Sequence, residues 1–219
     1  MIISRKPILC YVTDRRSLAG EGKISNLIDM IRRAAAAGVD WIQVREKDLS
    51  AKELLQLTRA AIAETRHERS HGNRILVNDR LDVAWVAGAG GVHLGEQSLA
   101  VSTVKRLRAS ASWPADFLVG ASCHSLEAAI AAERDGADYV IFGPIFETPS
   151  KVPFGSPQGL QRLGEVCRQL RIPVIAIGGI TATNACECLA VGAAGIAAIR
   201  LFQDSDNLAE EVARIRASS

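Results

Sequence analysis

Short apolar segments alternate with longer amphipathic segments along the whole chain. The apolar segments have the length of buried strands, and the amphipathic ones carry apolar residues at helical spacing. We expect strands at residues 8–13, 41–45, 74–78, 91–94, 117–122, 139–143, 173–178 and 195–199. We expect helices at residues 24–38, 50–70, 81–90, 100–110, 125–136, 159–170, 183–192 and 207–217.

Strict alternation of strand and helix is typical of a parallel sheet with right-handed crossovers. Eight such units favour a closed (β/α)8 TIM barrel, with an open doubly wound sheet as the alternative. Several predicted helices end on a glycine, the residue that best tolerates the left-handed conformation after a helix: Gly38, Gly72, Gly136 and Gly192. No linker or low-complexity segment divides the chain, so we expect residues 1–219 to form a single domain.

Polar residues follow the predicted strand 41–45. Because side chains alternate along a strand, Gln43, Arg45 and Lys47 would share the inner side of the barrel, at or above its mouth. Two cations on one inner face are unfavourable without an opposite charge nearby. One interpretation is a clamp for a phosphorylated ligand. The other is an ion pair with a carboxylate of the chain itself, at Glu46, Asp48 or Asp79.

Other strand ends carry candidate chemistry, since the active sites of TIM barrels lie at the carboxyl ends of the strands. Asp79 could bind a divalent cation through its carboxylate oxygens, or it could cap the helix that starts near Leu81. Ser122 and His124 follow the fifth strand.

A glycine pair follows the seventh strand. Gly178 and Gly179 would let a phosphate approach the backbone at the start of the next helix. Glycine pairs also occur in ordinary turns, so this signal is weak by itself.

The composition excludes several classes of partner. There are 26 Lys and Arg residues and 24 Asp and Glu residues, a net charge of +2, which gives no reason to expect a nucleic acid or a membrane surface. No apolar run reaches about 18 residues, so we expect no segment that spans a membrane. The 5 cysteines are odd in number and irregularly spaced, which is typical of free thiols in a reducing cytoplasm. The sequence leaves open whether the chain forms a homo-oligomer.

Seven motifs, in this order along the chain, resemble the thiamine phosphate synthase family: YVTD, QVREKD, NDR, GVHLG, GASCHS, ADYVIFGPIFETPSK and IPVIAIGGIT. The resemblance implies a TIM-barrel transferase that joins hydroxymethylpyrimidine diphosphate to a thiazole phosphate with release of diphosphate. It also implies Mg²⁺ as cofactor, two phosphorylated small-molecule substrates and a cytoplasmic location.

The resemblance also implies roles for individual residues. The catalytic residues would be Arg45, Lys47, Ser122 and Lys151. Asp79 would bind magnesium. The substrate-binding residues would be Gln43 for the pyrimidine, Arg45, Lys47, Asn78, Ser122 and Lys151 for the diphosphate, Thr148, Ser150, Gly178 and Gly179 for the thiazole phosphate, and His124.

One position departs from the family pattern. Synthases usually have an aspartate shortly after GVHLG as a second magnesium ligand, and this chain has Ser98 there. Ser98 could face the metal or simply cap the helix near Ala100, and Glu96 could replace the aspartate only if the loop bends differently. Arg200 stands where small residues are usual, and it would either add charge to the thiazole phosphate site or block it.

The missing aspartate keeps two alternatives open. One is a thiazole tautomerase of the same family, which relies on a histidine at the position of His124. The other is a non-catalytic regulatory protein that binds thiamine precursors.

Overall fold

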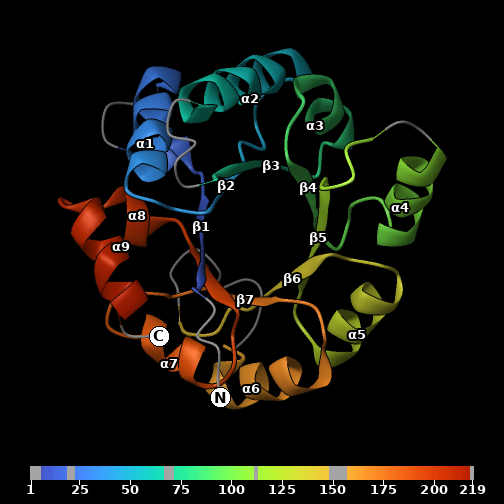
Figure 1. Cartoon of the computed structure of the whole chain (residues 1–219), viewed down its shortest axis with the longest axis vertical. Helices are drawn as coiled ribbons and strands as arrows, with labels where there is room; N and C mark the ends of the chain where they lie inside the picture. The colour runs from blue at the N-terminus through green and yellow to red at the C-terminus, as the bar shows by residue number, and fades with distance from the viewer. Residues whose placement is uncertain (1–5, 19–22, 67–71, 111–112, 148–156, 218–219) are drawn as a thin grey trace.

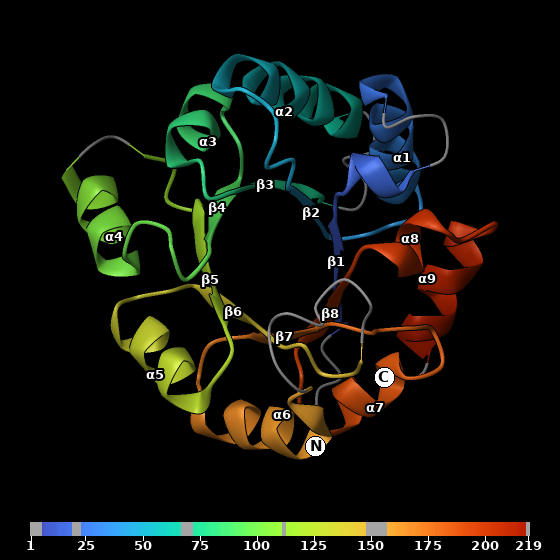
Figure 2. The same ribbon diagram turned by 180° about the vertical axis from the view of Figure 1, so that it is seen from behind.

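The computed structural model describes residues 6–18, 23–66, 72–110, 113–147 and 157–217. Eight parallel strands form a closed barrel in the order β1 to β8, and the helices surround it (Figures 1 and 2). The strands are β1 (Ile8–Val12), β2 (Trp41–Val44), β3 (Arg74–Asn78), β4 (Gly91–Leu94), β5 (Leu118–Cys123), β6 (Tyr139–Phe142), β7 (Val174–Ile177) and β8 (Gly195–Ala198). The (β/α)8 barrel predicted from the sequence is therefore confirmed, and the open sheet is wrong.

The helices follow the predicted alternation. They are α1 (Ile24–Ala36), α2 (Ala51–Arg66), α3 (Leu81–Ala87), α4 (Val101–Ser110), α5 (Leu126–Arg134), α6 (Gly159–Gln169), α7 (Ala185–Ala190), α8 (Arg200–Gln203) and α9 (Leu208–Ala217). The four glycines expected at helix ends all have positive φ, from 70° to 109°. No described helix has the length and apolar character needed to cross a membrane.

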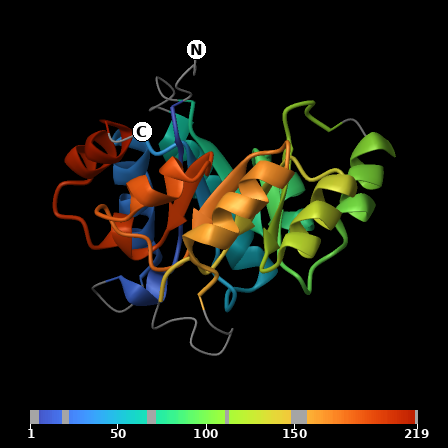
Figure 3. The ribbon, with the colours of Figure 1, turned by 90° about the horizontal axis from the view of Figure 1, so that it is seen from below.

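Two short elements were not predicted. A 3-10 helix, η1 (Arg15–Ser17), follows β1, and α8 follows β8. Both are too short for a helical period to be visible in the sequence. Figure 3 shows η1 on the lower side of the barrel in that view, which is therefore the side where the strands end.

The barrel has two apolar layers. The larger packs the outer side of the strands against the helices and includes Ile42 and Val44 of β2. The smaller fills the barrel itself and includes Val12 and Leu76. Gln43 pairs in register with both of these inner residues, so its side chain belongs to the inner layer. The alternation expected for β2 thus orients Gln43 inward.

Candidate active site

Gln43 is a polar residue within the apolar interior of the barrel. It is 2% exposed, and its Nε2 has no hydrogen-bond partner among the described residues. A buried donor without a partner costs free energy, so such groups often serve a ligand. The position of Gln43 therefore suits recognition of a polar group that enters the barrel mouth.

Arg45 and Lys47 follow Gln43 on the segment that leaves β2. The Arg45 backbone N–H donates to Thr13 Oγ1 at 2.9 Å, which fixes the start of this segment to the end of β1. No ion pair of either cation is found within the described residues. Lys47 is exposed, and Arg45 is half-buried.

The acids next to these cations have other partners. Glu46 Oε2 lies 3.0 Å from Arg15 Nη1. Asp48 Oδ2 lies 2.8 Å from Arg16 Nη2 and also pairs with Arg15. The ion pairs considered from the sequence between Arg45 or Lys47 and these two carboxylates are therefore absent from the described structure.

Asp79 is held by donors from three sides. Its Oδ2 accepts from Asn78 Nδ2 at 2.7 Å, and its Oδ1 accepts from the Gly95 N–H at 3.0 Å and from the Ser98 hydroxyl. Burial alone would raise the pKa of Asp79, but these hydrogen bonds and the charge of Lys47 outweigh it and lower the pKa below its usual value. The carboxylate is therefore ionised at neutral pH.

Asp79 also has an unusual backbone. Its φ of 61° is positive, which is uncommon for a residue other than glycine. The N-cap position of α3 belongs to Arg80, and no side chain caps this helix. The interpretation of Asp79 as a helix cap is therefore wrong.

Ser98 is in direct contact with Asp79. Its Oγ accepts from the Gly95 N–H at 2.7 Å and donates to Asp79. Glu96 lies elsewhere, with its Oε1 4.0 Å from His124 Nε2. Of the two residues considered as a second oxygen ligand, the structure thus brings Ser98 to Asp79 and directs Glu96 toward His124.

Ser122 belongs to a chain of hydrogen bonds that the sequence did not reveal. Its Oγ lies 2.8 Å from Nε2 of His93, whose Nδ1 lies 3.1 Å from the Tyr139 hydroxyl. His93 is 2% exposed and lies on the inner face of β4. The alternation within GVHL could have pointed to it, because His93 separates two outward-facing residues.

His124 has one ring nitrogen fixed. Its Nδ1 donates to the carbonyl oxygen of Gly143, and its Nε2 lies on the side of Glu96. The side chain is 33% exposed.

Gly178 and Gly179 form a tight turn after β7. Both have positive φ, and a Cβ on Gly179 would lie 2.5 Å from the backbone oxygen of Glu147. Within the described residues, the Gly179 N–H has no acceptor. These features leave a backbone donor available to an anion. Thr148 and Ser150, expected at the thiazole phosphate, and Lys151, expected at the diphosphate, lie outside the described residues.

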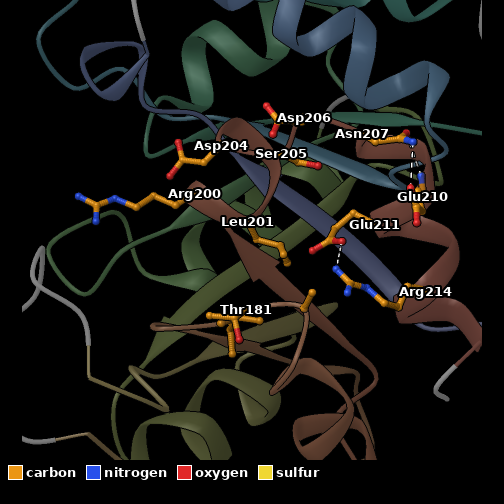
Figure 4. A pocket seen from close by; sticks show the side chains of 12 residues that line it. Thr181, Arg200, Leu201, Asp204, Ser205, Asp206, Asn207, Glu210, Glu211 and Arg214 are labelled. Atoms are coloured by element: carbon orange, nitrogen blue, oxygen red, sulfur yellow. Dashed lines mark hydrogen bonds and ion pairs between the residues drawn. The ribbon is translucent and has the colours of Figure 1, made fainter.

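Two cavities lie near these residues. The smaller, of about 260 Å³, is lined by residues of the expected diphosphate and metal sites, among them Lys47, Asn78 and Asp79. The larger, of about 520 Å³, lies between the loop after β7 and the helices α8 and α9 (Figure 4). The larger cavity is lined by both acidic and basic side chains. The residues expected to bind the diphosphate and the metal line the smaller cavity.

Arg200 is the first residue of α8 and is exposed. Figure 4 shows its side chain extending away from the Glu211–Arg214 pair of α9. No partner for its guanidinium is found in the described part of the chain.

Comparison of the sequence with known proteins identifies the family of the chain. The family model described as thiamine monophosphate synthase matches residues 9–202. The chain is 45% identical to the thiamine-phosphate synthase of Methanoculleus marisnigri, over 87% of this chain and 85% of that protein. It is 39% identical to that of Chlorobium phaeobacteroides, over 90% of this chain and 89% of that protein.

Solved structures are similar as well. Thiamine phosphate pyrophosphorylase from Pyrococcus furiosus superposes with a TM-score of 0.81 at 31% identity, covering 97% of this chain and 95% of that one. A 3-hexulose-6-phosphate synthase superposes with a TM-score of 0.69 at 17% identity, a likeness of fold alone. The chain belongs to the thiamine monophosphate synthase family.

Proposed function

We propose that this protein is a thiamine phosphate synthase, which transfers a hydroxymethylpyrimidine group from its diphosphate to the nitrogen of a thiazole phosphate. The observation that carries this proposal is the pair of cations, Arg45 and Lys47, neither of which forms an ion pair with a carboxylate among the described residues. They follow the carboxyl end of β2, and Lys47 lines the same cavity as the ionised Asp79. Cations that form no ion pair within the protein suit a highly charged anionic ligand.

The leaving group needs the most stabilisation in this reaction. The bond between the pyrimidine methylene carbon and the diphosphate oxygen breaks with its electron pair on the oxygen. Arg45, Lys47 and Asn78 would hold the developing negative charge, together with Lys151. The thiazole nitrogen then donates its lone pair to the methylene carbon, so no covalent bond to the protein is required.

The neutral part of the pyrimidine substrate would enter the barrel mouth. The unpartnered Nε2 of Gln43 would donate to a ring nitrogen or to another acceptor of the pyrimidine. Ser122, oriented by His93, would donate to the diphosphate. Both contacts would fix the methylene carbon in line for attack, which lowers the barrier through orientation.

The thiazole phosphate would bind on the opposite side of the mouth. The backbone N–H of Gly179, which has no acceptor within the described residues, supports this assignment. Thr148 and Ser150 would add hydroxyl donors there.

The residues around Asp79 fit a hard divalent cation such as Mg²⁺. Asp79 and Ser98 supply oxygen atoms, which this ion prefers, and substrate oxygens and waters would complete the shell. No cluster of three or more His, Cys, Asp or Glu side chains suited to a metal occurs among the described residues. When bound, the ion would neutralise charge on the diphosphate oxygens.

A thiazole tautomerase is the second candidate, and the orientation of His124 is the observation in its favour. With Nδ1 bound to Gly143, the ring presents Nε2 as a base near the mouth. A tautomerase has no use for the diphosphate site that Gln43, Lys47 and Asp79 would complete, which is why we prefer the synthase.

Turnover separates the candidates. Purified protein, both phosphorylated precursors and magnesium should yield thiamine phosphate, detected by mass spectrometry. Isomerisation of a thiazole carboxylate phosphate that disappears in His124→Ala, without any thiamine phosphate, would instead support the tautomerase. Binding of both precursors without any reaction would indicate the regulatory alternative.

A further inference from the structure

The segment after β2 is held by an ion-pair network with the end of β1. The Glu46 side chain is 2% exposed, and its Oε1 accepts from the Thr13 hydroxyl at 2.6 Å and from the Arg15 N–H at 3.1 Å. Its Oε2 accepts from Arg15 Nη1 at 3.0 Å. A buried carboxylate requires this kind of pairing and hydrogen bonding.

Arg15 bridges both acids of the segment. Its Nη1 also donates to Asp48 Oδ1 at 2.6 Å, and its side chain is only 14% exposed. Arg16 carries the same charge one residue later but is 71% exposed, and its guanidinium pairs with Asp48 alone among the described residues. The two neighbouring arginines therefore differ in burial and in the number of acids that they hold.

The order of residues along this segment makes the Arg15 bridge important for the expected diphosphate site at Arg45 and Lys47. In Arg45–Glu46–Lys47–Asp48 each cation is adjacent to an acid. A free carboxylate on this segment would attract Arg45 or Lys47 and reduce its availability to a ligand. Arg15 in η1 forms ion pairs with both acids and so keeps them directed toward η1.

The backbone of the segment is tied to the same residues. Thr13 Oγ1 accepts from the Arg45 N–H at 2.9 Å while its hydroxyl donates to Glu46, so one buried side chain fixes two successive residues. The backbone is therefore anchored by Thr13, while the direction of the two acids depends on the guanidinium of Arg15.

We infer that Arg15 is a positioning residue for the diphosphate: it holds Glu46 and Asp48 away from Arg45 and Lys47 so that both cations are available to the ligand. This inference rests on the proposed function, because it takes the anion at Arg45 and Lys47 to be the diphosphate of the substrate.

Calorimetric titration of inorganic diphosphate with magnesium present tests this inference. Arg15→Met should weaken binding about tenfold, because Glu46 and Asp48 lose the guanidinium that they share and can then compete for Arg45 and Lys47. Arg16→Met is the matched control, with the same loss of charge nearby, and should stay within about twofold of the wild-type protein. In steady-state kinetics, Arg15→Met should raise the KM for the pyrimidine diphosphate and leave that for the thiazole phosphate unchanged.

A second substitution separates charge competition from a loss of structure. Adding Asp48→Asn to Arg15→Met removes one of the released acids at a partly exposed position and should recover part of the binding, with no rise in Tm. If Arg15→Met does not fold, Arg15→Lys keeps the charge but cannot bridge both acids as a fork, and it should weaken binding by a smaller factor.

Three results would overturn the inference. Arg15→Met, or Arg15→Lys in its place, could bind diphosphate as the wild-type protein does. Both arginine variants could weaken binding equally, which would make charge alone responsible. Asp48→Asn could fail to recover any binding. If the wild-type protein itself bound no diphosphate, the proposed function would fail together with the inference. If the wild-type protein bound diphosphate and Arg15→Met bound it equally well, only the inference would fail.

Discussion

The hydroxyl of Ser98 donates a hydrogen bond to Oδ1 of Asp79. This contact joins the loop after β4 to the end of β3, and it shows that position 98 faces the candidate metal ligand. A carboxylate at position 98 would therefore stand beside Asp79, where a hydroxyl stands in this chain.

Ser98→Asp should strengthen magnesium binding. A hard cation gains from a second carboxylate, so the variant should bind Mg²⁺ more tightly in calorimetry and reach full activity at lower magnesium. Ser98→Ala is the control that removes the hydroxyl without adding charge. Superimposable magnesium titrations of wild type and Ser98→Asp would show that position 98 does not contribute to the metal site.

Ser98 should also influence stability in acid. Against the effect of burial, hydrogen bonds from Ser98 and Gly95, together with the charge of Lys47, lower the pKa of Asp79 in the folded protein below its ordinary value of 3.8. Its stabilising contribution is therefore complete above that value and is lost as the pH falls through the lower folded pKa. Ser98→Ala removes one of the causes of the lowered pKa. The difference between the unfolding free energies of wild type and variant should be larger at about pH 5 than at about pH 2. A constant difference in denaturant titrations would contradict the assignment.

Lys47→Ala should impair diphosphate binding selectively. Removal of one charge-stabilising donor typically costs about 2.7–4 kcal/mol of transition-state stabilisation, so kcat/KM for the pyrimidine diphosphate should fall by a factor of about 100 or more. Lys52→Ala changes the same charge on the exposed surface of α2 and should be close to wild type. Equal kinetics for the two variants would mean that Lys47 is only a solvated side chain.

His93 and Ser122 should act as a unit. His93→Asn would leave Ser122 without its partner, so the single variants and the double variant with Ser122→Ala should lose similar amounts of kcat. The measurement is a double-mutant cycle on turnover, with melting curves to exclude unfolded protein. Fully additive losses would show that His93 supports the barrel interior and not Ser122.

The strand positions and the inward direction of Gln43 could be predicted because they follow from local periodicity. The pairing of Glu46 and Asp48 could not. Their partners, Arg15 and Arg16, lie 31 to 33 residues away in sequence, and only the closure of β1 against β2 brings the two segments together. The sequence placed both acids next to Arg45 and Lys47, which kept a local ion pair open as an alternative to the phosphate clamp.

Two other features depend on contacts between distant segments. The sequence left open whether Ser98 faces the metal site or caps a helix, and it missed the hydrogen bonds of His93. The Ser98–Asp79 contact depends on how the loop after β4 folds back over β3, which no local pattern specifies. The chain from Tyr139 through His93 to Ser122 joins three strands inside the barrel, and only their relative register makes it continuous.

The most direct test of the account is a single assay. Wild-type protein is incubated with hydroxymethylpyrimidine diphosphate, the thiazole phosphate and magnesium, and the products are measured by mass spectrometry. The account predicts thiamine phosphate and diphosphate in equal amounts, lost in Lys47→Ala and kept in Lys52→Ala. Absence of thiamine phosphate from the folded wild-type protein, with both substrates bound, would contradict it.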